Sequence, residues 1–246
     1  MHIQTHDSVE AMGRAAAEQA AFALCEAVAD RDEATLVVAT GTSQLTVLDA
    51  LVGAVEVPWS RIHGFHLDEY VGLPMSHGAS FRRYLKERLV DRVPIGSFTY
   101  LDGEKDAEAA AQDAGATLSQ RPIDVLLCGI GENGHLAFND PPADFETTRP
   151  YLVVPLDAAC RRQQVGEGWF STLDEVPTHA ISMSIRQILS ARKIVCSVPD
   201  TRKAAAVRAA VQGEISPTVP ASILRTHADV TLHLDRPAAS LLKDAG

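Results

Sequence analysis

The sequence predicts an α/β protein with a Rossmann-like, mostly parallel sheet and helices on both faces. Short apolar, partly β-branched segments alternate with amphipathic or alanine-rich ones. A succession of strand and helix of this kind favours a parallel sheet with right-handed crossovers. No internal repeat, low-complexity segment or shift in composition divides the 246 residues. We therefore expect one domain over residues 1–246.

The predicted strands are short apolar runs bounded by turn residues. They span residues 34–40, the end of the segment 59–70, and residues 98–101, 123–128, 151–156, 180–185, 193–198 and 230–234. The predicted helices have apolar residues at helical spacing or are rich in alanine, and Ser8 is the expected cap of the first. They span residues 8–28, 44–51, 80–90, 104–119, 157–165, 201–211, 220–225 and the tail from Pro237.

Charge and cysteine usage limit the classes of partner and compartment. The 22 Lys and Arg against 32 Asp and Glu give a formal net charge of -10 without a basic stripe, which disfavours nucleic acid and anionic membranes. The four cysteines have no metal-ligand spacing, and reduced thiols fit a cytosolic protein. No segment resembles a signal peptide or approaches the ~20 apolar residues of a membrane span. We expect a cytoplasmic protein.

The stretch Cys128–Pro142, CGIGENGHLAFNDPP, is the strongest candidate for a functional site. It converts an apolar strand into a glycine-rich turn, and glycines allow the backbone to turn sharply there. His135 and Asp140 are thereby expected at the carboxyl edge of the sheet. Ligands bind at this edge in open α/β sheets, so both side chains are candidates for chemistry.

A second polar segment, Trp59–Tyr70, also ends a predicted strand. Alternation of side chains along a strand places His66 with Asp68 and sends His63 to the other face. The segment therefore does not predict a metal site. Asp68 is either a functional carboxylate that projects beyond the sheet, or a helix cap or surface ion pair.

Two predicted helix starts are candidates for anion binding. Gly41, Thr42 and Ser43 follow a strand and open a helix, where unpaired backbone N–H groups can hold a phosphate. An ordinary turn with a Thr or Ser cap is the alternative, because the P-loop pattern is absent. Arg202 and Lys203 lie in a first helical turn, where cations oppose the helix dipole. A bound anion would explain them, and exposed surface charge is the alternative.

A loop at residues 166–173 has two glycines around bulky apolar side chains. It is either part of a mobile lid near residues 157–174 or a loop fixed by packing of Trp169 and Phe170.

Three segments resemble glucosamine-6-phosphate deaminases (glucosamine/galactosamine-6-phosphate isomerases): LDEYVGLP from Leu67, GIGENGHLAFND from Gly129 and RKAAAVRAAVQG from Arg202. The resemblance extends along nearly the whole chain. It implies a Rossmann-like sheet and conversion of an amino-sugar phosphate to a ketose phosphate and ammonia, with no nucleotide or metal cofactor.

The resemblance also implies roles for particular residues. Asp68 matches the base that moves a proton from C2 to C1 of the sugar, His135 the ring-opening acid–base group, and Asp140 the acid that supports it. These roles are chemically consistent, since the proton transfer needs a carboxylate near both carbons and ring opening needs a group that titrates near neutral pH. The implied phosphate-binding residues are Gly41, Thr42, Ser43 and Lys203.

The chain departs from the family pattern at three places. Asn133 stands where Asp is typical, so it can hold His135 by a hydrogen bond but not by charge. Asp140 stands where Glu is usual. The lid arginine that binds phosphate has no match in register, and Arg161, with Arg162 beside it, is the nearest candidate.

Two alternative functions stay open at this point. One is 6-phosphogluconolactonase, whose members usually carry Arg where Tyr70 stands. The other is a sensor that binds a sugar phosphate without turnover, which Asn133 favours. The sequence leaves open the sugar configuration and whether the protein forms a homo-oligomer.

Overall fold

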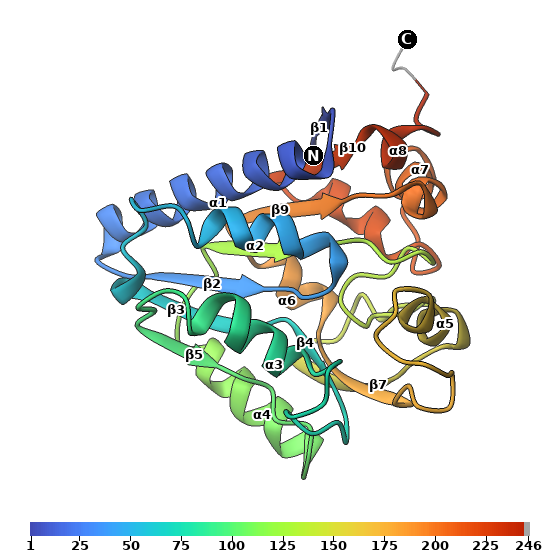
Figure 1. Cartoon of the computed structure of the whole chain (residues 1–246), viewed down its shortest axis with the longest axis horizontal. Helices are drawn as coiled ribbons and strands as arrows, with labels where there is room; N and C mark the ends of the chain where they lie inside the picture. Colours follow the sequence, from blue (N-terminus) through green and yellow to red (C-terminus); the bar gives the residue numbers. More distant parts are fainter. Residues whose placement is uncertain (244–246) are drawn as a thin grey trace.

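The computed structural model describes residues 1–243 and contains two sheets (Figure 1). The larger is a 7-stranded sheet in the order β1-β10-β9-β6-β2-β3-β5, with every neighbouring pair parallel. Its strands are β1 (His2–His6), β2 (Ala34–Val38), β3 (Ile62–His66), β5 (Ser97–Thr99), β6 (Val125–Cys128), β9 (Lys193–Val198) and β10 (Val230–Asp235). The predicted α/β fold with a mostly parallel sheet is confirmed.

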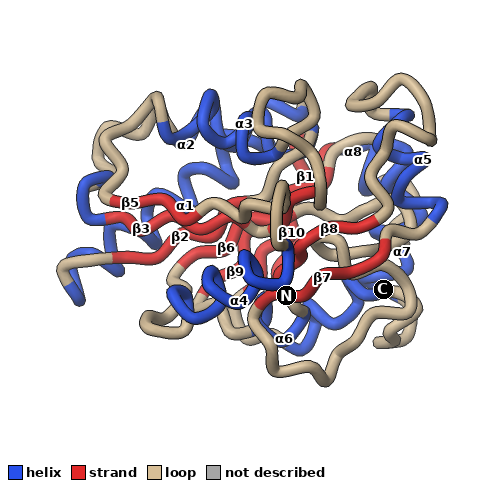
Figure 2. Tube along the Cα trace, turned by 90° about the horizontal axis from the view of Figure 1, so that it is seen from below, coloured by secondary structure: helices blue, strands red, loops and turns tan. Residues whose placement is uncertain are grey.

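The smaller sheet is antiparallel and 3-stranded, in the order β4-β8-β7. Its strands are β4 (Asp68–Tyr70), β8 (His179–Met183) and β7 (Tyr151–Pro155). It lies beside the carboxyl edge of the large sheet, as the views in Figures 1 and 2 agree. This places residues of both sheets around one region.

Helices cover both faces of the large sheet (Figure 2). One face packs against α1 and α2, and the other against α4, α6 and α7, with separate apolar clusters on the two faces. The helices are α1 (Val9–Arg31), α2 (Leu45–Leu51), α3 (Phe81–Leu85), α4 (Ala107–Leu118), α5 (Ala158–Gly166), α6 (Ile185–Leu189), α7 (Ala204–Gln212) and α8 (Arg236–Ala239). None of these described helices is long and apolar enough to cross a membrane.

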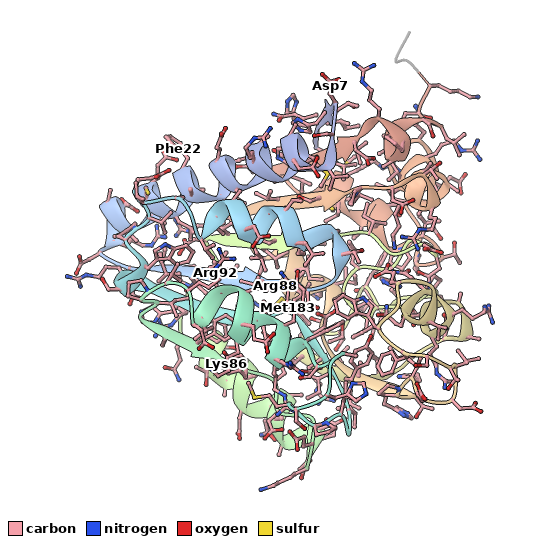
Figure 3. The ribbon with its side chains drawn as sticks, in the orientation of Figure 1. Asp7, Phe22, Lys86, Arg88, Arg92 and Met183 are labelled. Carbon is pink, nitrogen blue, oxygen red and sulfur yellow. The ribbon has the colours of Figure 1, made fainter. Side chains whose placement is uncertain are left out.

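The first helix shows how sequence determines packing. Ser8 caps α1 by accepting a hydrogen bond from the Ala11 N–H at 3.1 Å, as its residue type predicts. A Cβ atom at Gly13 would lie 2.4 Å from Oγ1 of Thr46, so glycine permits the close approach of α1 and α2. Phe22 projects from the outer face of α1 (Figure 3), whereas the alanines of the inner face pack on the sheet.

The single strand predicted at the end of residues 59–70 is two strands, β3 and β4, because the chain changes sheets at Leu67. Its N–H donates to the Val38 carbonyl of the large sheet at 3.0 Å, and its carbonyl accepts from the Met183 N–H of the small sheet at 3.0 Å. Strict alternation therefore stops there. Asp68 lines a cavity, while His66 is fully buried and does not line it.

Three further predictions differ from the structure. β1 was not expected, because His2–His6 is polar and only partly buried on an edge strand. The strand predicted over 180–185 ends at Met183, where Ser184 caps α6. The predicted helical tail is helical only to Ala239, and its last residues, 244–246, lie outside the described part of the chain.

Candidate active site

A cavity of about 530 Å³ lies at the carboxyl edge of the large sheet. Its walls come from the segments that follow β2, β6 and β9, from the junction of β3 with β4, and from the end of α5. Predicted site residues that line it are Gly41, Thr42, Ser43, Asp68, His135 and Lys203. The topology thus brings together side chains from segments far apart in the sequence, at the edge where such sheets bind ligands.

Asp68 presents an almost unsolvated carboxyl group to this cavity. The residue is 6% exposed, and its Oδ1 atom is buried without a hydrogen-bond partner among the described residues. Burial, reinforced by the charge of Glu69, raises the pKa of Asp68 to about 8. A carboxylate with few hydrogen bonds and a raised pKa is a stronger base than a solvated one, which suits proton abstraction.

Glu69, and not Asp68, binds the start of α3, beside the N-cap residue Ser80. The Glu69 carboxylate accepts hydrogen bonds from the backbone N–H groups of Phe81, at 3.1 Å, and Arg82, at 2.7 Å, at the start of α3. The Arg82 guanidinium lies 3.4 Å from the same carboxylate. Of two adjacent acids, one is therefore held in the fold and the other is left free for chemistry.

His135 is paired with Asp140 at the other polar wall. The Nδ1 atom of His135 lies 3.0 Å from Oδ1 of Asp140. Burial raises the pKa of Asp140, but hydrogen bonds from His135, the Asp157 N–H and Asn133, with the charge of His135, outweigh it and leave this pKa below its usual value. An ionised Asp140 fixes the proton of the neutral ring on Nδ1, so Nε2 is the proton acceptor.

Gly131 leaves room for the imidazole ring of His135, because it has no side chain. A Cβ atom there would lie 2.3 Å from Nε2 of His135. Asn139 fixes the loop that carries His135: its side-chain amide donates to the backbone carbonyls of Leu136 and Met183, at 2.8 Å each. The His135 ring therefore packs against the glycine-rich turn that the sequence predicts.

Asn133 forms the expected hydrogen bond to His135, through the backbone of that residue. Its side-chain Oδ1 accepts from the His135 backbone N–H at 3.1 Å, and its side-chain amide nitrogen donates to Asp140 at 3.0 Å and to Asp157 at 3.2 Å. Asn133 thus bridges two carboxylates. An amide can do this because it supplies two N–H donors, whereas a carboxylate supplies none.

Thr42 and Lys203 meet at the predicted phosphate-binding end. Gly41 adopts a φ of 92° before the turn, a conformation that favours glycine, and Thr42 begins the helical turn that leads into α2. The Lys203 side chain is 7% exposed, and its Nζ atom lies 3.3 Å from Oε1 of Glu167. Thr42 donates to Oε2 of the same carboxylate at 3.5 Å.

Arg161 does not take part in this arrangement, and its binding of phosphate stays a prediction. Its guanidinium donates to the carbonyls of Leu173, at 2.6 Å, and Val176, at 3.0 Å, and it does not line the cavity. It ties α5 to the loop that follows. Arg202 does line the cavity, but it is partly exposed and paired with Asp200 at 2.8 Å.

One group of side chains has donor atoms suited to a metal. The ligand atoms of His135, Asp140 and Cys160 lie within 4.8 Å of one another. Burial, followed by the charges of Asp140 and Asp157, raises the pKa of the Cys160 thiol. A protonated thiol is a poor ligand, and Asp140 already accepts hydrogen bonds from its neighbours, so the group fits a hydrogen-bonded support of His135 better than a metal site.

Comparison with protein families identifies the chain. The model of the family described as glucosamine-6-phosphate isomerases/6-phosphogluconolactonase matches residues 7–233. The chain belongs to this family. It is similar to the glucosamine-6-phosphate deaminases of Bacillus pumilus (35% identical, 98% of this chain and 100% of the relative) and Streptococcus thermophilus (36% identical, 85% and 88%).

Solved structures share the fold of the chain. A monomeric glucosamine-6-phosphate deaminase aligns with a TM-score of 0.89 at 31% identity, over 98% of this chain and 100% of that one. A 6-phosphogluconolactonase from Shewanella baltica aligns with a TM-score of 0.78 at 23% identity, over 96% and 97%. The second likeness shows the shared fold alone.

Sequence reasoning missed two polar residues of the site. Asp157 caps α5 through a 2.6 Å bond from the Cys160 N–H, and an acid just before a predicted helix is a signal that could have indicated the cap. Glu167 lies between two glycines in the predicted lid and carries no local signal. Its contacts with Thr42 and Lys203 form only because the fold brings these distant residues against it.

Proposed function

We propose that the protein is an amino-sugar-6-phosphate deaminase/isomerase that converts glucosamine 6-phosphate, or a close analogue, and water to fructose 6-phosphate and ammonia. The observation that carries the proposal is the position of Asp68. An unpartnered, buried carboxyl with a raised pKa faces the same cavity as His135 and the basic end at Lys203. The similarity to deaminases over nearly the whole chain supports this activity.

The site residues have complementary roles in this reaction. His135, with Nδ1 held by Asp140, takes the proton of the C1 hydroxyl group on Nε2 and passes it to the ring oxygen. The bond between C1 and the ring oxygen breaks, and the pyranose opens to the aldehyde. Asp68 then removes the proton from C2 and returns it at C1, while one amine proton is transferred to the C1 oxygen. C1 becomes a hydroxymethyl group, and the amine-bearing C2 becomes an imine. Water adds to this carbon and ammonia leaves. The whole sequence needs no redox cofactor.

Phosphate binding supplies orientation for the proton transfer. We assign this role to Gly41, Thr42, Ser43 and Lys203, which lie at one end of the cavity. A phosphate held there uses binding energy from a remote group to place C1 and C2 at Asp68. We further propose that the chain functions as one domain with a lid near residues 157–174. Cytosolic location and homo-oligomerisation stay predictions.

A product assay tests the proposed function. The protein is incubated separately with glucosamine 6-phosphate, galactosamine 6-phosphate and 6-phosphogluconolactone, and ammonia, ketose phosphate and 6-phosphogluconate are measured. We expect ammonia and ketose phosphate in equal amounts from an amino-sugar phosphate. Lactone hydrolysis without ammonia would identify a lactonase, and tight binding without any product would identify a sensor.

The pH dependence of turnover tests the role of Asp68. The base must be ionised, and its pKa in the free protein is about 8. We therefore expect kcat/KM to rise with pH, by about tenfold per unit well below that pKa, and to level off above it. Initial rates of ammonia release at constant ionic strength from pH 6 to pH 9 measure this limb. A flat profile over the range would contradict the assignment.

A further inference from the structure

The carboxylate of Glu167 lies in the part of the cavity that we assign to the substrate phosphate. Glu167 follows α5, lines the cavity, and has a side chain that is only 5% exposed. Buried carboxylates require compensation by charge or hydrogen bonds. The residues around Glu167 show which groups compensate the charge of its carboxylate.

Both oxygens of Glu167 accept from groups around the basic end of the cavity. Oε1 lies 2.8 Å from the Gln163 amide nitrogen and 3.3 Å from Lys203 Nζ. Oε2 lies 3.3 Å from the Trp169 indole nitrogen and 3.5 Å from Thr42 Oγ1. The carboxylate thus occupies a built anion site made of one cation and several neutral donors.

Two of these donors, Thr42 and Lys203, are also the groups assigned to the phosphate. A phosphate oxygen at hydrogen-bond distance from Lys203 Nζ would meet the Glu167 carboxylate, and two anions this close in a buried site repel strongly. The phosphate and the carboxylate therefore exclude each other from these donors.

The backbone around Glu167 permits the side chain to leave. Gly166 and Gly168 flank it, Gly168 has a φ of 81°, and a Cβ atom added at either glycine would have no neighbour within 4 Å. The segment is therefore not wedged between packed groups at these two positions, while α5 itself stays anchored by the Asp157 cap at its other end.

We propose that Glu167 is an internal competitor of the substrate phosphate: its carboxylate fills the anion subsite at Thr42 and Lys203 in the free protein, and a phosphate dianion displaces it. The residue thereby sets the affinity of the site and its selectivity for phosphorylated sugars. A dianion gains more from Lys203 than a monoanion does, so it displaces the carboxylate more readily. This inference rests on the proposed function insofar as the ligand is a sugar phosphate.

Binding of inorganic phosphate tests the competition without turnover. Calorimetric titration at constant ionic strength compares the wild type with Glu167→Gln and Glu167→Ala. Removing the competing charge is expected to tighten phosphate binding by about tenfold or more, because a charge-assisted contact no longer has to be broken. Glu175→Gln is the matched control, because Glu175 is an exposed acid after α5 that does not line the cavity. The phosphate affinity of this control variant is expected to equal that of the wild type.

Substrate measurements complete the test. In Glu167→Gln we expect KM for the phosphorylated amino sugar to fall by a factor similar to the change in phosphate affinity, with a much smaller change in kcat, and the affinity for unphosphorylated glucosamine to stay the same. Unchanged or weaker phosphate binding in both Glu167 variants would overturn the inference, since the carboxylate would then help to hold Lys203 in place. Tighter phosphate binding in a protein that releases no ammonia would leave the inference intact and refute the proposed function.

Discussion

Asp68→Asn is expected to lower kcat for ammonia release by about 10³-fold, since an amide cannot accept the C2 proton and general-base catalysis typically contributes 10²–10⁴-fold. Asparagine has nearly the same shape, and no described residue donates to Oδ1 of Asp68, so the structure of the cavity is retained. Ammonia release under saturating substrate measures the effect, and phosphate affinity is expected to stay at the wild-type value. A variant that keeps wild-type turnover would refute the assigned base.

Unfolding does not account for such a loss, and the pH dependence of stability shows why. The folded-state pKa of Asp68, about 8, lies above its ordinary value of 3.8. The stability that goes with this shift is fully present below the unfolded-state pKa and is lost as pH rises through about 8. The amide introduced by Asp68→Asn cannot ionise, so the variant is expected to melt no lower than the wild type at pH 8 to 9.

Asn133→Asp is expected to destabilise the protein strongly at alkaline pH. The substitution removes the donor that lies 3.0 Å from Asp140 and 3.2 Å from Asp157 and puts a third carboxylate against these two. Loss of hydrogen bonds to charged acceptors, with the added repulsion, costs at least about 2 kcal/mol of unfolding free energy at pH 8. Chemical denaturation at pH 5.5 and pH 8 measures the cost.

The sign of the pH effect distinguishes repulsion from simple loss of contacts. Crowding raises the pKa of a carboxyl in the folded state above its unfolded value, so the stability of Asn133→Asp is largest at low pH and falls as pH rises. Asn133→Ala loses the same hydrogen bonds without adding charge and is the control. Equal stability of the two variants at pH 8 would show that the carboxylates do not interact.

Local sequence predicted most elements and several groups of the site. The glycine-rich turn after β6 and the alternation of strands and helices depend on neighbouring residues, so they can be read one segment at a time. His135 and Asp140 are five residues apart, and their 3.0 Å contact follows from one loop. Asp68 and Lys203 were candidates from their positions at a strand end and a helix start, and the family resemblance assigned their roles. The topology places both on the same cavity.

The features of the fold and the site that could not be predicted depend on contacts between distant segments. No pattern near Leu67 shows that its carbonyl pairs with Met183, so the change of sheets could not be predicted. The roles of Asn133 and Glu167 likewise depend on partners from other elements. The direction of the Arg161 side chain could not be predicted either, because it is set by hydrogen bonds to two carbonyls of the loop after α5.

The pairing of β1 with β10 has a consequence for how the chain folds. His2–His6 lies in register with Thr231–Asp235, so this ladder joins segments separated by nearly the whole sequence. Contacts of such long range form late, because the entropy of closing the intervening chain must first be offset by other contacts. During synthesis the first strand has no partner until the last one emerges from the ribosome. The edge of β10 that faces away from β9 is therefore covered only late in folding.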